Sequence, residues 1–112
     1  MSALLASDKL AELAELGILD EMGRLFFSEG GAMLAALEAA MASGDLVAVR
    51  HAAHSLRGIS GTIGADDLCA ASKDTELAAR AGREADARAG VLAVRREWDA
   101  VAPVLRTRLA AA

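Results

Sequence analysis

The stretch of sequence that decides the fold is Leu46–Ile63, which reads LVAVRHAAHSLRGISGTI. On a helix, its apolar and small residues recur at alternating spacings of three and four and so form one continuous stripe. These residues are Leu46, Val49, Ala53, Leu56, Ser60 and Ile63. A stripe of this kind is typical of a helix that is buried along one side. We therefore expect the stretch to form one wall of a helical core.

The other side of this expected helix differs from an ordinary solvated surface, which would carry Glu, Lys and Ala. Its residues are Val47, Arg50, His51, His54, Arg57, Gly58 and Gly61. Each glycine inside a helix costs about 1 kcal/mol relative to Ala, so its presence needs a reason. Either the missing side chains give a large partner access to the exposed imidazole of His54, or they allow close packing against a neighbouring helix.

The composition predicts a single all-helical domain over residues 1–112. The chain is 54% hydrophobic with only two Phe and one Trp, and its small aliphatic helix formers favour closely packed helices over sheets. A net charge of −4 without a basic stripe argues against nucleic acid as a partner. The single cysteine, Cys69, excludes an internal disulfide, and neither a secretory signal nor an uninterrupted apolar run of about 20 residues is evident. We therefore expect a cytoplasmic protein without a membrane span.

Four further helices are expected from apolar periodicity and turn residues. They span Lys9–Leu16, Asp20–Ala42, Asp67–Ala81 and Glu84–Leu109. The expected turn glycines are Gly17, Gly44, Gly64 and Gly82. The expected N-caps are Ser7 or Asp8, Asp20, Asp45 and Asp66. Because the connections are short, neighbouring helices must run antiparallel, and the predicted fold is an all-α, up-down-up-down four-helix bundle with a short extra N-terminal helix.

Some positions are expected to depart from regular helix geometry or to need special packing. The stretch Ser28–Gly31 predicts a local irregularity within one continuous helix. Pro103 predicts a bend near residues 99–103, or a final helical segment that begins there. Trp98 is expected to anchor the core, and Thr75, on the inner stripe of its helix, should need a backbone hydrogen-bond partner.

A specific motif surrounds His54. The run Ala53–Gly58 (AHSLRG) is followed by Ser60 and then by Ile63 and Gly64. It resembles the signature of histidine-containing phosphotransfer (HPt) domains, which is Ala-His-x-Leu-Lys-Gly, a small residue and then Leu/Ile-Gly. The one departure within the motif is an Arg where Lys is commoner, and both supply a cation with different hydrogen-bond geometry.

The resemblance implies a role for each polar residue on this helix face. His54 would be the phospho-acceptor, since a neutral imidazole has a nucleophilic nitrogen near pH 7. Arg57, one turn later on the same face, would contact the phosphoryl oxygens. The remaining candidates, for docking a partner, are Gly58, Gly61, His51 and Arg50. Glu76 also matches a Glu that is common in the family.

The resemblance also implies partners and cofactors. A receiver-domain aspartate of a hybrid histidine kinase would donate the phosphoryl group, and the receiver domain of a response regulator would accept it. The required Mg²⁺ would lie in the receiver, so this protein, expected to be a monomer, would need no cofactor. The sequence contains no P-loop or Gly-rich ATP motif, and we expect no ATP-dependent kinase activity. His51 and His54 lack a nearby third ligand for Zn²⁺, so no metal site is expected.

Two other functions stay open on sequence grounds. A helical adaptor could bind receiver or kinase domains without accepting phosphate, in which case His54 and Arg57 would have no chemical role. The chain could also be a histidine-bearing kinase fragment, such as the phosphoryl-carrying domain of a chemotaxis kinase, although the sequence contains no ATP-binding domain.

Overall fold

The computed structural model describes residues 5–111, and each regular element in that range is a helix. The elements are α1 (Ser7–Glu15), α2 (Leu19–Leu25), η1 (Phe26–Gly30), α3 (Gly31–Ala42), α4 (Leu46–Ile63), α5 (Asp66–Arg80) and α6 (Glu84–Ala111). The segments α2, η1 and α3 follow one another without a break and form one rod, which we call the α2–α3 rod. The predicted all-α fold is confirmed.

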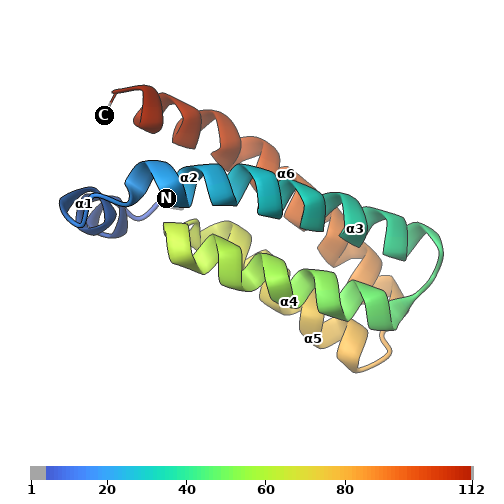
Figure 1. Cartoon of the computed structure of the whole chain (residues 1–112). Coiled ribbons are helices and arrows are strands. Elements are labelled where there is room, and N and C mark those ends of the chain that lie inside the picture. Colours follow the sequence, from blue (N-terminus) through green and yellow to red (C-terminus); the bar gives the residue numbers. More distant parts are fainter. Residues whose placement is uncertain (1–4, 112) are drawn as a thin grey trace.

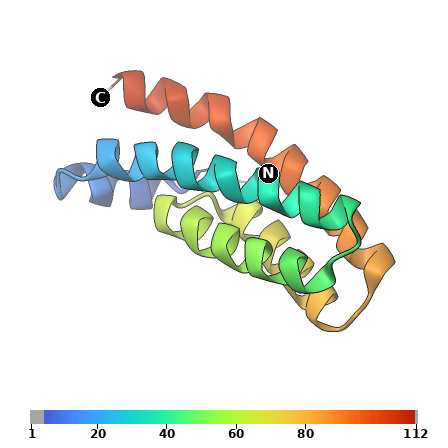
Figure 2. The same cartoon turned by 45° about the vertical axis from the view of Figure 1, so that its right-hand side comes forward.

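The long helices form a bundle with alternating chain direction. Figure 1 shows the α2–α3 rod, α4, α5 and α6 roughly side by side, each running opposite to the one before it. Helix α3 packs on α4, α4 on α5 and α5 on α6, and α6 also contacts α3. Helix α1 lies at the end of the bundle where the C-terminus lies, and the turned view in Figure 2 shows the same order. This is the expected up-down-up-down arrangement with a short extra helix.

Of the expected N-caps, the structure uses Asp45, whose carboxylate accepts a hydrogen bond from the backbone N–H of Ala48 at 3.0 Å. The other cap predictions are wrong, because these residues lie within the first two positions of their helices: Ser7, Asp8, Asp20 and Asp66. The cap positions are occupied by apolar residues without side-chain cap bonds: Ala6, Ile18 and Ala65. Ala65 is fully buried, so a polar cap there would lose its water, while an acidic side chain in the first turn is still favoured by the helix dipole.

Helices α4 and α6 present their predicted stripes to the core. On α4 the buried residues of the stripe are Val49, Ala53, Leu56, Ser60 and Ile63, with Leu46 partly buried. On α6 they are Val91, Val94, Trp98, Val101 and Leu105. Helices α5 and α6 approach closely at Gly90, where an added Cβ would clash with Oγ1 of Thr75. The buried Thr75 hydroxyl donates to the carbonyl of Ala71 at 2.8 Å, which is the backbone partner that was expected.

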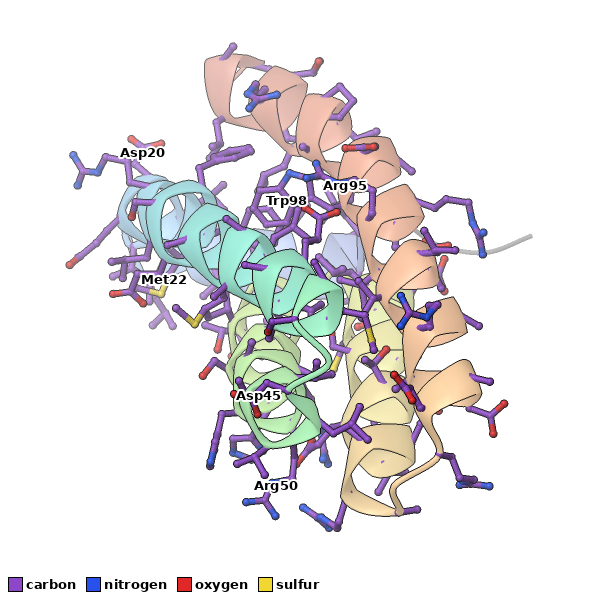
Figure 3. The ribbon with its side chains drawn as sticks, turned by 90° about the vertical axis from the view of Figure 1, so that its right-hand side faces the viewer. Asp20, Met22, Asp45, Arg50, Arg95 and Trp98 are labelled. Atoms are coloured by element: carbon purple, nitrogen blue, oxygen red, sulfur yellow. The ribbon has the colours of Figure 1, made fainter. Side chains whose placement is uncertain are left out.

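Trp98 joins α6 to the α2–α3 rod, and Figure 3 shows it between these elements. Its ring stacks on Phe26, with centroids 4.6 Å and planes 8° apart. Gly30 lies against the same ring, since a Cβ there would come within 2.8 Å of a Trp98 ring carbon. On the same two elements, Arg95 donates two hydrogen bonds to the carboxylate of Glu38, at 3.0 and 2.6 Å. Trp98 is therefore the core anchor that the sequence predicted.

The two expected irregularities have different outcomes. The one at Ser28–Gly31 is confirmed as the π-helical segment η1 inside a continuous rod. Helix α6 continues through Pro103, so the alternative of a separate final segment is wrong. Pro103 is exposed, whereas Ala102 and Leu105 beside it are buried, so packing holds the helix together across the missing amide hydrogen.

The α2–α3 rod has a second property that was not expected from the sequence. By length and composition, Leu19–Ala42 meets the requirements for a membrane-spanning helix. The core helix of a helical bundle meets the same requirements. In the structure, Leu34 and Leu37 of this rod are buried in the bundle core.

Candidate functional site

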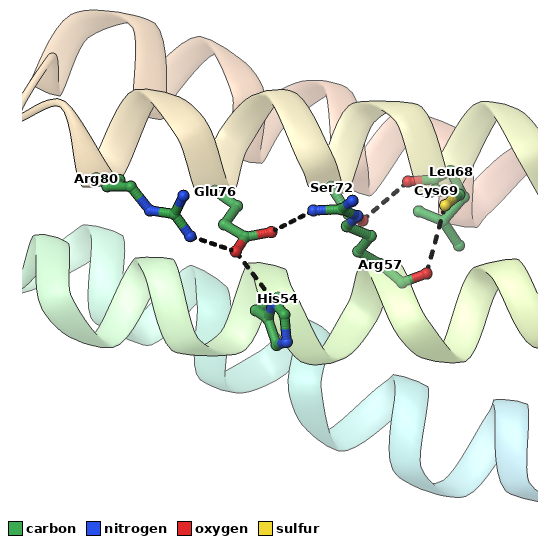
Figure 4. Close-up of polar contacts among 7 residues, drawn as sticks. All are labelled: His54, Arg57, Leu68, Cys69, Ser72, Glu76 and Arg80. Carbon is green, nitrogen blue, oxygen red and sulfur yellow. Dashed lines mark hydrogen bonds and ion pairs between the residues drawn. The ribbon is translucent and has the colours of Figure 1, made fainter.

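His54 projects from α4 toward solvent, with 70% of its side chain exposed. Its Nδ1 lies 2.9 Å from Oε2 of Glu76 on α5, whose side chain is 2% exposed (Figure 4). An ionised carboxylate can only accept hydrogen bonds, so the proton lies on Nδ1 of the neutral ring. The other ring nitrogen, Nε2, therefore keeps its lone pair, and Figure 4 shows it on the side of this largely exposed ring that faces away from Glu76.

Two guanidinium groups also bind Glu76. Arg57 Nη1 donates to Oε1 at 3.2 Å, and Arg80 Nη2 donates to Oε2 at 3.2 Å. Burial of the carboxyl group acts to raise its pKa, but the hydrogen bonds from His54 and Arg57, together with the positive charge of Arg57, outweigh it and hold the pKa of Glu76 below its ordinary value of 4.5. Glu76 is therefore ionised at neutral pH and can accept a hydrogen bond from Nδ1–H of His54.

The lowered pKa makes part of the stability depend on pH. Because the folded state binds the Glu76 proton less readily than the unfolded chain, the contribution is present above pH 4.5 and is lost as the pH falls through the folded-state pKa. We expect Glu76→Gln to be less stable than the wild type at neutral pH, with the difference shrinking as the pH falls below 4.5. Urea unfolding of both proteins across this range measures it. A stability difference that stays constant with pH would contradict the lowered pKa of Glu76.

The two glycines of the motif lie beside this cluster. An added Cβ at Gly58 would have no heavy atom within 4 Å, so the proposal of close helix packing is wrong for this residue. At Gly61 an added Cβ would lie 3.7 Å from Sγ of Cys69, which is an ordinary contact. Packing therefore requires a glycine at neither position, and the space in front of Gly58 is open.

The structure brings most of the predicted residues together in one shallow groove between α4 and α5. The residues that line it are His54, Arg57, Gly58, Gly61, Thr62 and Cys69. Cys69 donates its thiol hydrogen to the carbonyl of Arg57, at 3.4 Å. His51 is exposed and Arg50 is partly exposed, one turn before His54 on α4. Both lie outside the groove lining.

Comparison with known proteins agrees with this geometry. The family model described as "Hpt domain" matches residues 21–103, about three quarters of the chain. The chain belongs to the Hpt domain family. A crystal structure of the histidine-containing phosphotransfer protein HptB from Pseudomonas aeruginosa PAO1 is similar to this Hpt domain, with a TM-score of 0.86 and 29% identity over 100% of this chain and 99% of that one. A comparison with curated proteins gave no significant match. Membership of this family supports a role in histidine phosphotransfer. Hpt proteins carry out this transfer in phosphorelays, where they interact with receiver domains.

Sequence reasoning missed how the Hpt domain holds its histidine. Glu76 was noted as a family position, but its burial and its bond to His54 were not predicted. A signal existed, because Glu76 lies four residues after Ser72 and eight after Leu68, on the buried stripe of α5. A carboxylate at such a position needs partners from a neighbouring helix. Arg80, four residues further on, was also not considered.

Proposed function

We propose that this Hpt domain accepts a phosphoryl group on Nε2 of His54 from the aspartate of one receiver domain and passes it to the aspartate of another. The observation that carries the proposal is the 2.9 Å contact between Nδ1 of His54 and the buried Glu76. This bond fixes which ring nitrogen carries the proton. It leaves Nε2 exposed with the lone pair that a nucleophile needs.

The transfer step uses these groups as follows. The lone pair of Nε2 attacks the phosphorus of the aspartyl phosphate, a P–N bond forms, and the P–O bond breaks with its electron pair passing to the aspartate carboxylate. The ring, still protonated on Nδ1, then carries a positive charge that the carboxylate of Glu76 balances. Onward transfer to a second aspartate reverses these changes, and the electron pair returns to Nε2. Positioning and charge stabilisation supply most of the catalysis in such a step.

Arg57 is well placed to stabilise the phosphoryl group. Its side chain is 41% exposed, and its contact to Glu76 is a single hydrogen bond from Nη1. A guanidinium group has five N–H donors, so Arg57 can give up this one bond and turn to bind phosphoryl oxygens on the neighbouring ring. The Mg²⁺ that the transfer requires would belong to the receiver, and we assign this chain no cofactor and no ATP-dependent step. We further propose that it acts as a monomer in the cytoplasm.

The receiver would dock over the open side of α4. The missing side chain at Gly58 leaves room for its active-site loops beside His54. Arg50, His51 and Gly61 lie on the same helix and would border this contact. A small pocket between the α2–α3 rod and α4 extends the surface, lined by Met22, Leu25, Phe26, Glu29, Ile59, Thr62 and Ile63. Within it Leu25 is 38% exposed, whereas Phe26 is 1% exposed and belongs to the core.

Transfer from a phosphorylated receiver tests the proposal. Receiver domains of the source organism would be phosphorylated on aspartate with acetyl phosphate, freed of the donor and mixed with this protein. We expect at least one receiver to lose its phosphoryl group to the Hpt domain, which then carries it in a linkage that acid cleaves and alkali does not. Binding of a receiver without any transfer of its phosphoryl group would favour the adaptor function instead.

Gly58 offers a separate test of the access argument. We expect Gly58→Gln to slow transfer from a receiver strongly, because the new side chain fills the space in front of His54. Gly58→Ala is the matched control, since it adds helix propensity with little bulk. It should raise the free energy of unfolding by about 1 kcal/mol and retain most of the transfer rate. Unimpaired transfer by the Gln variant would show that this position does not face the receiver.

A further inference from the structure

Glu76 has a third side-chain partner that the transfer step described above does not use. Arg80 follows it by four residues on α5, and its Nη2 donates to Oε2 at 3.2 Å. Oε2 is the same oxygen that accepts the hydrogen bond from Nδ1–H of His54, whereas Arg57 donates to Oε1. The carboxylate is therefore held at both oxygens, and Figure 4 shows Glu76 between Arg80 and Arg57.

The two arginines are placed for different tasks. Arg57 lines the groove in front of His54, so a phosphoryl group on Nε2 would attract its guanidinium. When Arg57 turns to that group, Oε1 of Glu76 loses its hydrogen bond. Arg80 lies on the opposite side of Glu76 and outside the groove lining, so its bond to Oε2 can persist.

Building on the proposed function, we propose that Arg80 is a positioning residue for phosphotransfer. It holds Glu76 in place as the acceptor for Nδ1–H of His54 while Arg57 engages the phosphoryl group. Without Arg80, a carboxylate released by Arg57 would rotate to find other donors, because a buried charged group is costly to leave without partners. The imidazole would then lose the contact that fixes its tautomer.

The chain contains a matched control for this residue. Arg88 on α6 also follows a glutamate by four residues, with its Nη2 3.5 Å from Oε1 of Glu84. The two arginine side chains are almost equally exposed, 57% for Arg80 and 56% for Arg88. Arg88→Gln therefore removes an equally exposed arginine from a glutamate at the same spacing, at a site that does not contact His54 and where the glutamate is itself exposed.

The experiment has two readouts. Nitrogen NMR of the imidazole ring, in unphosphorylated proteins that also carry Arg57→Gln to mimic the release of Glu76 by Arg57, reports which nitrogen carries the proton. Phosphoramidate, a small-molecule donor, then phosphorylates the proteins without a receiver, and the onward rate to one receiver is measured. We expect Arg80→Gln to reduce the fraction of the Nδ1–H tautomer and to slow onward transfer about two- to fivefold, the range that an exposed ion pair supports. Arg80→Lys should recover most of both, and Arg88→Gln should change neither.

Several results would overturn this role. An unchanged tautomer in Arg80→Gln, or an equal change in Arg88→Gln, would show that Arg80 forms only a surface ion pair. A changed tautomer with an unchanged transfer rate would show that the positioning has no consequence for transfer. If the wild type is not phosphorylated at all, the proposed function fails. The tautomer comparison in the unphosphorylated proteins would still show whether Arg80 orients His54.

Discussion

Replacing His54 with Gln is expected to abolish phosphoryl acceptance while leaving the fold intact. An amide side chain has no nucleophilic ring nitrogen, so no P–N bond can form. The His54 side chain is 70% exposed but donates to the buried Glu76, which keeps Arg57 and Arg80 as partners, so its loss should lower the free energy of unfolding by only about 1 kcal/mol. Labelling by a phosphorylated receiver or by phosphoramidate, together with urea unfolding, measures both effects.

His51→Gln provides the control, since His51 is the other histidine of the chain and lies one turn earlier on the exposed side of α4. With phosphoramidate as donor, which needs no docking surface, this variant should be labelled like the wild type. Label that remains in the His54 variant would show that another residue accepts the phosphoryl group. Loss of label in the His51 variant would show that His51, one turn earlier, accepts the phosphoryl group instead of His54.

The second large effect concerns stability. Trp98→Ala is expected to lower the free energy of unfolding by about 3–5 kcal/mol, which is the usual cost of removing a large aromatic side chain from a core. Its ring stacks on Phe26 at 4.6 Å and meets Phe27 edge-on at 6.3 Å, so the truncation leaves a cavity between α6 and the α2–α3 rod. Small domains are stable by only about 5–15 kcal/mol in total, so this loss is a large share. The urea midpoint measures it.

Leu92→Ala tests whether the effect comes from the core. Leu92 lies on the same helix as Trp98 but is 62% exposed, so its truncation should cost less than about 0.5 kcal/mol. Similar losses of stability in the two variants would contradict the role of Trp98 as the anchor between α6 and the α2–α3 rod.

The helices and their buried faces could be predicted because periodicity is a local property of the sequence. The stripe on Leu46–Ile63 and the one containing Trp98 both face the core as expected. Helix starts were less predictable, because a serine or aspartate is compatible with the cap and with the first turn alike. This is why Asp45 is a cap whereas Asp66 lies inside its helix.

The site could be predicted in part. The motif identified His54 and Arg57, but their shared partner Glu76 lies 22 residues after His54 on another helix. Whether a residue on α5 reaches α4 depends on how α5 is rotated about its axis, and packing of the whole bundle sets that rotation. For the same reason the sequence could not decide whether Gly58 meets a neighbouring helix or open space.

The most direct test of the central claim is to find which nitrogen of His54 bears the phosphoryl group. The protein, labelled with nitrogen-15 in its histidines, would be phosphorylated with phosphoramidate and examined by nitrogen and phosphorus NMR. The structure predicts phosphorus bonded to Nε2, with a proton kept on Nδ1 by Glu76. Phosphorus bonded to Nδ1, or to any residue other than His54, would contradict it.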